Sequence, residues 1–152
     1  MTDMVRLVRE RDIAAPPSLV LPALDDFHHW VDWSPFERLD PDVQRTYSGP
    51  ASGVGSNDAW QGNRKAGAGT MTITTATVDV VEVDVRFLKP FRSTSLSTFT
   101  LTPTATGTHV TWQMSFPKTA LSRVMGAVSP YEKMLGPDLD RGLDSLKALL
   151  ER

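Results

Sequence analysis

The sequence has no cysteine, no long apolar run and only three histidines among its 152 residues. The absence of cysteine excludes disulfide scaffolds, thiolate zinc sites and thiol nucleophiles, and it is consistent with a reducing compartment. The N-terminal residues lack the apolar core of a signal peptide, and no segment is apolar over the length of a membrane span. We therefore expect a cytoplasmic protein with no membrane span.

An excess of positive charge is also missing. Sixteen lysine and arginine residues stand against eighteen aspartate and glutamate residues, which gives a formal net charge of -2. A chain with this balance does not bind polyanions by charge alone, so we expect no nucleic-acid partner. With 40% hydrophobic residues the chain can bury one sizeable core, and its length predicts a single domain over residues 1–152.

The beginning of the chain predicts one strand and two short helices. Residues 4–13 alternate as a strand with charge on its outer face. A proline pair then favours the first turn of a short helix, which Pro22 kinks or ends. Phe27, Trp30 and Trp33 recur every third residue, which predicts a second short helix.

The middle of the chain predicts an antiparallel meander. Runs rich in valine, threonine and phenylalanine are separated by glycine and proline turns, and the connections are short. The expected strands are residues 43–48, 54–62, 69–79, 81–88, 94–103 and 107–116. Apolar and polar residues alternate in several of them, so one face of the sheet is buried and the other is in water.

A helical period returns after Pro117. An apolar stripe between Leu121 and Val128 predicts one helix, and a longer helix is expected to start at Pro137. The leucines at positions 139, 143, 146 and 150 give this helix one continuous apolar face, which must lie on the sheet.

Together these elements predict an α+β fold. A seven-stranded, curved antiparallel sheet would wrap around the long C-terminal helix, and two short helices would follow the first strand. One helix cannot fill the concave side of such a sheet. The remainder is therefore either plugged by side chains or left as a cavity, commonly of about 300 to 1,000 Å³ in binding proteins.

Short motifs along the whole chain carry a family resemblance. They are Ile13-Ala14-Ala15-Pro16, Asp26-Phe27 with Trp30 and Trp33-Ser34-Pro35-Phe36-Glu37, Asp40-Pro41, Tyr47-Ser48-Gly49-Pro50, Gly53-Val54-Gly55-Ser56, Trp60, Gly67 with Gly69, Met71 and Ile73, Pro90-Phe91, Phe99 with Leu101 and Pro103, Gly107-Thr108 with Val110 and Trp112, and Asp140 with Gly142-Leu143 and Leu146-Lys147. In this order they resemble the START-like helix-grip superfamily, also called SRPBCC, in its polyketide cyclase/dehydrase-like branch. Pro22 and Pro137 depart from the usual pattern.

The resemblance implies a hydrophobic cavity between the long helix and the sheet. Members of the superfamily use this cavity for lipids, hormones, polyketides and other apolar molecules. The resemblance implies no particular reaction, because the fold hosts transport, sensing, chaperone activation and aromatisation alike.

Aromatic, methionine and leucine side chains expected near the concave face are the candidate ligand contacts, since aromatic walls and flexible thioethers suit an apolar cavity. These candidates are Trp33, Phe36, Trp60, Met71, Phe87, Trp112, Met114, Met125, Leu135 and Leu139. Packing in the core is the alternative role for each. Trp60 and Trp112 are the stronger tryptophan candidates because they lie on expected strands.

Candidates for catalysis are few. Asp58 shares a strand face with Trp60, so it is either a general base at the rim of the cavity or a solvated carboxylate. Tyr131 follows a break between helices and faces either the cavity mouth or water. The paired glycines are turn residues, because neither pair has the spacing of a phosphate-binding loop.

The three histidines do not form a metal site. His28 and His29 are adjacent on a helix and point apart, and His109 lies on the strand face opposite Trp112. We therefore expect no metal and no cofactor.

Three functions remain open. The first is binding of a small hydrophobic or aromatic ligand, the second is a polyketide cyclase/aromatase-like enzyme that uses the same cavity, and the third is a protein-interaction or stress-response module. An enzyme needs inward ionisable groups, a carrier needs only volume, and an interaction module needs an exposed apolar patch. The oligomeric state is left open.

Overall fold

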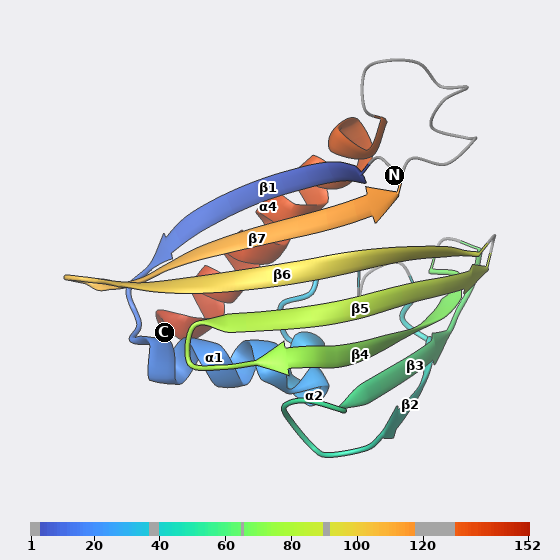
Figure 1. Ribbon diagram of the computed structural model, residues 1–152, viewed down its shortest axis with the longest axis horizontal. Helices are drawn as coiled ribbons and strands as arrows, with labels where there is room; N and C mark the ends of the chain where they lie inside the picture. The colour runs from blue at the N-terminus through green and yellow to red at the C-terminus, as the bar shows by residue number, and fades with distance from the viewer. Residues whose placement is uncertain (1–3, 37–39, 65, 90–91, 118–129) are drawn as a thin grey trace.

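The computed structural model describes residues 4–36, 40–64, 66–89, 92–117 and 130–152 (Figure 1). The strands are β1 (Met4–Ile13), β2 (Gln44–Ser48), β3 (Asn57–Gln61), β4 (Ala68–Ala76), β5 (Val80–Lys89), β6 (Ser93–Thr104) and β7 (Gly107–Pro117). The helices are α1 (Pro17–Asp25), α2 (Phe27–Trp30) and α4 (Pro130–Leu150).

All seven strands form one antiparallel sheet in the order β1-β7-β6-β5-β4-β3-β2. Strands β2 to β7 follow one another as a meander, and β1 returns to pair with the last of them. The sheet curves, with α1, α2 and α4 on its concave side (Figure 1). The predicted α+β helix-grip fold, with two short helices after the first strand, is therefore confirmed.

Several element boundaries differ from the prediction. Strand β3 begins only at Asn57, because Gly53 and Gly55 have positive φ angles of 78° and 95° and form a turn that a strand residue does not adopt. Strand β4 ends at Ala76, and the Thr77 side chain then accepts a hydrogen bond from the backbone N–H of Val80.

Pro22 was expected to kink or end the first short helix and Pro137 to begin the long one, and both lie inside helices. Helix α1 continues past Pro22 to Asp25, and α4 begins at Pro130 rather than at the predicted Pro137. A proline removes one backbone hydrogen bond, at a cost of about 3 kcal/mol in a helix interior. Pro137 is exposed, and the buried leucines that follow it hold the helix against the sheet. The predicted helix between Leu121 and Val128 lies outside the described residues.

The core lies between the concave face of the sheet and the three helices. Leu139, Leu143 and Leu146 of α4 are completely buried, as their spacing predicts. Trp30 and Trp33 pack edge-on against Phe99, whose ring stacks on Trp112 at a centroid distance of 5.0 Å. This aromatic cluster closes one end of the space beneath the sheet.

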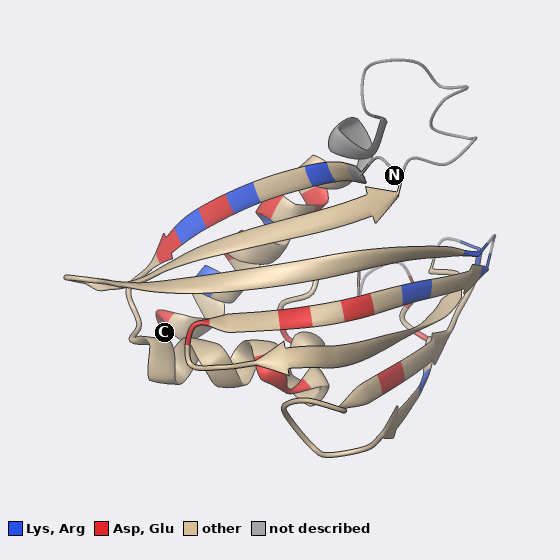
Figure 2. Cartoon of the chain, in the orientation of Figure 1, with Lys and Arg blue, Asp and Glu red and all other residues tan. Residues whose placement is uncertain are grey.

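Ion pairs attach α4 to the edge strand β1. Arg9 and Arg11 both contact Asp140, at 3.2 Å and 3.0 Å, and Arg11 also reaches Asp144 at 2.9 Å. Figure 2 shows the basic and acidic residues that alternate along β1. These pairs fix the helix at one edge of the sheet.

No helix within the described ranges is long and apolar enough to cross a membrane.

Candidate functional site

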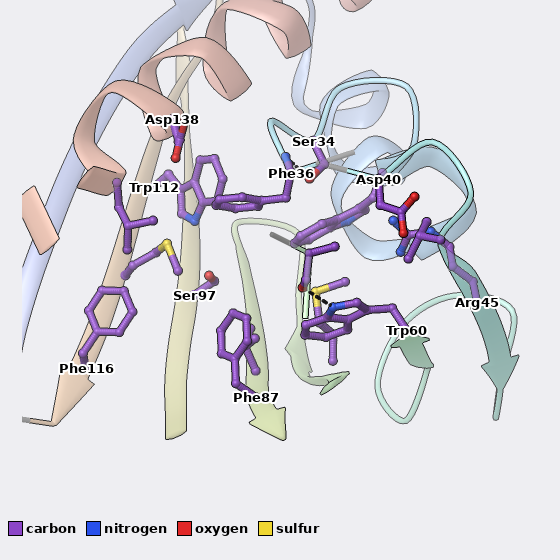
Figure 3. A pocket seen from close by; sticks show the side chains of 17 residues that line it. Ser34, Phe36, Asp40, Arg45, Trp60, Phe87, Ser97, Trp112, Phe116 and Asp138 are labelled. Atoms are coloured by element: carbon purple, nitrogen blue, oxygen red, sulfur yellow. Dashed lines mark hydrogen bonds between the residues drawn. The ribbon is translucent and has the colours of Figure 1, made fainter. Parts of the chain in front are cut away.

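A cavity of about 330 Å³ lies under the concave face of the sheet, between its strands, the segment after α2 and the first turns of α4 (Figure 3). Its wall is made by Trp30, Ser34, Phe36, Asp40, Val43, Arg45, Trp60, Ala66, Met71, Val85, Phe87, Ser97, Trp112, Met114, Phe116, Leu135 and Asp138. Most of these side chains are aromatic or aliphatic. The volume is at the lower end of the range for small-molecule sites.

Strand register explains why side chains from four central strands meet in this wall. Met71 lies opposite Val85, and Met114 lies opposite Ser97. Side chains of directly paired residues point to the same face of a sheet, and residues two positions apart do so as well. The alternate positions of β4, β5, β6 and β7 therefore build one continuous concave surface.

Trp60 of β3 forms part of the cavity wall, and the position of its side chain depends on a glycine of the neighbouring strand. Its indole packs edge-on against Phe87 at a centroid distance of 5.4 Å, and its Nε1–H donates to the carbonyl of Ala66 at 2.9 Å. Gly69 lies opposite Trp60 in the register, and a Cβ there would lie 2.6 Å from the indole ring. Glycine at position 69 thus leaves room for the ring.

The charged groups in the wall are already engaged. Arg45 pairs with Asp58 at 2.8 Å, and Asp138 pairs with Arg141. Asp40 accepts hydrogen bonds from the backbone N–H groups of residues 42 and 63, which ties the segment after α2 to the turn after β3. The site therefore presents an apolar wall with compensated charges.

Most of the candidate ligand contacts lie in the wall. These are Phe36, Trp60, Met71, Phe87, Trp112, Met114 and Leu135. Trp33 and Leu139 instead lie in the core, at 2% and 0% exposure. Trp33 is held there because its indole N–H donates to the carbonyl of Ala23 at 2.9 Å. Met125 lies outside the described residues.

Of the two catalytic candidates, Asp58 is placed differently from either expectation. Asp58 is fully buried and pairs with Arg45, and it is not among the residues that line the cavity, so it is neither solvated nor part of the cavity wall. Tyr131 falls within α4, and its side chain is outside the described part of the structure.

Sequence reasoning missed several wall residues. Val85, Ser97 and Phe116 follow the alternation of their strands, so the same pattern that selected Phe87 and Met114 could have found them. The contacts from irregular segments, among them Ser34, Asp40, Val43 and Ala66, carry no periodic signal.

The histidines lie at the surface. His28 stacks on Tyr47, and its Nδ1 lies 2.8 Å from Asp26. The side chain of His109 contacts Asp12 at 2.7 Å and Glu10 at 3.2 Å. These hydrogen bonds, that to Asp12 first, raise the pKa of His109 above its ordinary value of 6.5. Among the residues that the structure describes, no group of three or more His, Cys, Asp or Glu is placed to hold a metal.

Comparison with known proteins agrees with this architecture. Residues 4–151 match the family described as polyketide cyclase / dehydrase and lipid transport. The chain belongs to this family, and with it to the SRPBCC helix-grip superfamily. No curated protein matches the chain.

Solved structures share the fold at low sequence identity. Protein MLL2253 from Mesorhizobium loti is 23% identical, with a TM-score of 0.68 over 97% of this chain and 98% of that one. The Aha1 protein from Colwellia psychrerythraea is 17% identical, with a TM-score of 0.64 over 97% and 96%. The di-domain ARO/CYC protein StfQ from the steffimycin biosynthetic pathway is 12% identical, with a TM-score of 0.69 over 97% of this chain and 51% of that one.

Proposed function

We propose that the protein binds a small hydrophobic or aromatic molecule in the cavity between the sheet and α4. The observation that carries this proposal is the cavity of about 330 Å³ with a wall of aromatic, methionine and aliphatic side chains. Burial of apolar ligand surface contributes about 25 cal/mol per Å². A molecule that covers this wall therefore gains affinity without a dedicated charged group.

The ionisable groups of the wall favour binding over catalysis. Asp40 is occupied by backbone N–H groups, Arg45 by Asp58, and Asp138 by Arg141. A general base must come within hydrogen-bond distance of the proton that it removes. Asp58 does not line the cavity and its carboxylate is ion-paired with Arg45 at 2.8 Å, which disfavours its acting as a general base on a bound molecule.

A cyclase/aromatase-like enzyme is the second candidate. The family description and the shared fold with StfQ favour it. In such a reaction a carbon of a folded chain loses a proton to a base and attacks a carbonyl carbon, whose oxygen then takes up a proton. The cavity would hold the two carbons together, and such proximity lowers the barrier. The base would be Asp58 or Tyr131.

Ligand screening tests the proposal. The purified protein is titrated with a panel of uncharged apolar and aromatic compounds, and both the melting temperature and the tryptophan emission are recorded. Binding to the native state raises the melting temperature by mass action. Trp30, Trp60 and Trp112 line the cavity, so a bound aromatic compound also changes their emission. A panel that gives neither response contradicts the proposal.

Three further expectations accompany this proposal. We propose one domain over residues 1–152, a cytoplasmic location and no nucleic-acid partner. The charge balance of the sequence supports the last of these.

A further inference from the structure

The four tryptophans differ in how their indole N–H groups are satisfied. Trp30, Trp33 and Trp60 each donate to a backbone carbonyl at 2.9 Å. Within the described residues the Nε1–H of Trp112 has no hydrogen-bond partner, although the side chain is only 1% exposed. A buried donor without a partner costs about 1–3 kcal/mol. Trp112 lies in the cavity wall, so a bound molecule is the available source of an acceptor.

Polar groups on the neighbouring strand lie beside this indole. Ser97 also lines the cavity, and Phe99 and Met114 are the direct partners of Trp112 and Ser97 in the β6–β7 register. Trp112 and Ser97 are therefore diagonal neighbours on one face, within reach of a long side chain. Figure 3 shows the indole nitrogen of Trp112 on the side of the ring that faces Ser97.

A second unsatisfied group continues this line of polar atoms. Ser95 lies two residues before Ser97 on the same face of β6 and is buried, and its hydroxyl has no hydrogen-bond partner in the part of the chain that the structure describes. The buried face of β6 thus carries serines where the facing positions of β5 carry Val83 and Val85. The part of the wall that strands β4 to β7 form is therefore apolar apart from one narrow polar strip, the Ser97 hydroxyl and the indole N–H of Trp112, and Ser95 continues this strip along β6 outside the wall.

The charged side chains around the cavity restrict which chemical group of a ligand can bind at this polar strip. Among the described wall residues, Asp40 and Asp138 are acidic, and the single basic side chain, Arg45, is paired with Asp58. A carboxylate or phosphate group would therefore find, among the described wall residues, no basic side chain that is not already paired with a carboxylate. The indole N–H is a donor only, so its partner must be an acceptor.

We infer that the ligand carries an uncharged carbonyl oxygen that accepts a hydrogen bond from the Nε1–H of Trp112, with the Ser97 hydroxyl as a second donor. This inference rests on the proposed function and names its ligand class, which is aromatic or cyclic ketones. A cavity of about 330 Å³ is at the lower end of the range for small-molecule sites, so ketones with one or two rings are the size to test.

Access to the indole N–H requires a side chain to move, because the nitrogen is covered in this structure. Met114 is the neighbour best suited to this movement. It lines the cavity beside Trp112 on β7 and opposite Ser97 on β6. Its unbranched thioether changes conformation at low cost, so an entering ketone can displace it.

The test compares two probes on three proteins. The probes are 1-tetralone, a two-ring aromatic ketone, and tetralin, the same skeleton without the carbonyl. Dissociation constants are measured for the native protein, for Trp112→Phe and for Trp60→Phe. The difference in hydrophobicity between the probes contributes equally to the ratio of the two constants in each protein, so it cancels when the ratio of a variant is compared with the native ratio. Trp60→Phe is the matched control, because the indole N–H that it removes is already bonded to Ala66.

We expect Trp112→Phe to reduce the preference for 1-tetralone by about fivefold, the value of one hydrogen bond of roughly 1 kcal/mol. The ratio in Trp60→Phe should equal the native ratio. An unchanged ratio in Trp112→Phe, with both probes bound, overturns this inference and leaves the proposed function standing; a water that already satisfies the indole would give this result. Failure of both probes to bind the native protein contradicts the proposed function as well.

Two further measurements cover the remaining outcomes. If Trp112→Phe does not fold, NMR of the indole ¹H–¹⁵N signals of the native protein tests whether the ligand accepts this hydrogen bond. Saturation with 1-tetralone should shift the Trp112 signal downfield of its position with tetralin, and equal positions overturn the inference. The anion 1-naphthoate should bind more weakly than 1-tetralone, and tighter binding of the anion contradicts an uncharged ligand.

Discussion

The indole of Trp60 packs against the backbone of Gly69, its direct partner across β3 and β4. A Cβ at position 69 would lie 2.6 Å from the indole and 2.2 Å from the carbonyl oxygen of Arg86. One glycine therefore sets both the position of a cavity wall and the close approach of two strands.

Gly69→Ala should destabilise the protein by about 1–3 kcal/mol, as overpacking of a filled site does. The free energy of unfolding in urea measures this change. In a Trp60→Leu background Gly69→Ala should cost less than in the native protein but should still destabilise, because the Arg86 carbonyl still opposes the new methyl group. If Gly69→Ala cost nothing in that background, the ring alone would require glycine at this position.

Asp58→Asn tests the role of the buried carboxylate. The change keeps the shape but weakens the pair with Arg45, whose side chain is 17% exposed, so a loss of stability of about 1–3 kcal/mol is expected. Affinity for an apolar ligand should change by less than about tenfold, or about 1.4 kcal/mol. A general base typically contributes 10²- to 10⁴-fold to a rate. A cyclisation activity that falls by two orders of magnitude in Asp58→Asn, at unchanged affinity, would establish the enzyme instead.

Stability should depend on pH through His109. Its pKa in the folded protein is raised by Asp12 and Glu10, above a value of 6.5 in the unfolded chain. The charged form therefore stabilises the fold fully below pH 6.5, and this contribution is lost as the pH rises through the folded-state pKa. The difference in unfolding free energy between the native protein and His109→Gln should be largest near pH 6 and decrease above it. A difference that stays constant from pH 6 to 9 would refute this assignment.

Helix α4 should be indispensable. Leu143 is completely buried, so Leu143→Ala should cost about 2–5 kcal/mol, and truncation after Gly136 should abolish cooperative unfolding. Leu150 is the matched control on the same helix, and because it is only partly buried Leu150→Ala should cost less. If the truncated protein still melted cooperatively at the melting temperature of the native protein, α4 would not be an essential part of the core.

Residues in strands could be predicted well because each strand has one buried and one exposed face. The alternation in β5 and β7 placed Phe87, Trp112 and Met114 on the side of the cavity. The ends of strands could be predicted less well from the sequence. The turn at Gly53 and Gly55, for example, depends on backbone angles that the hydrophobic pattern does not report.

Other parts of the site depend on tertiary contacts. Trp33 follows the same helical period as Trp30, yet only Trp30 reaches the cavity. The pairing of Arg45 with Asp58 joins β2 to β3, and the charge pattern of neither strand predicts it. The unsatisfied N–H of Trp112 is visible only once the acceptors around all four tryptophans are known.

The central claim is that the cavity holds a small apolar molecule, and native mass spectrometry of the protein purified from its own host tests it most directly. The native protein should retain a small molecule, as should Leu88→Trp, which adds the same ring on an exposed position of β5. Met71→Trp places that ring in the cavity wall and should lose the molecule while remaining folded. Native protein that carries nothing, or a molecule retained equally by folded Met71→Trp, would contradict the account.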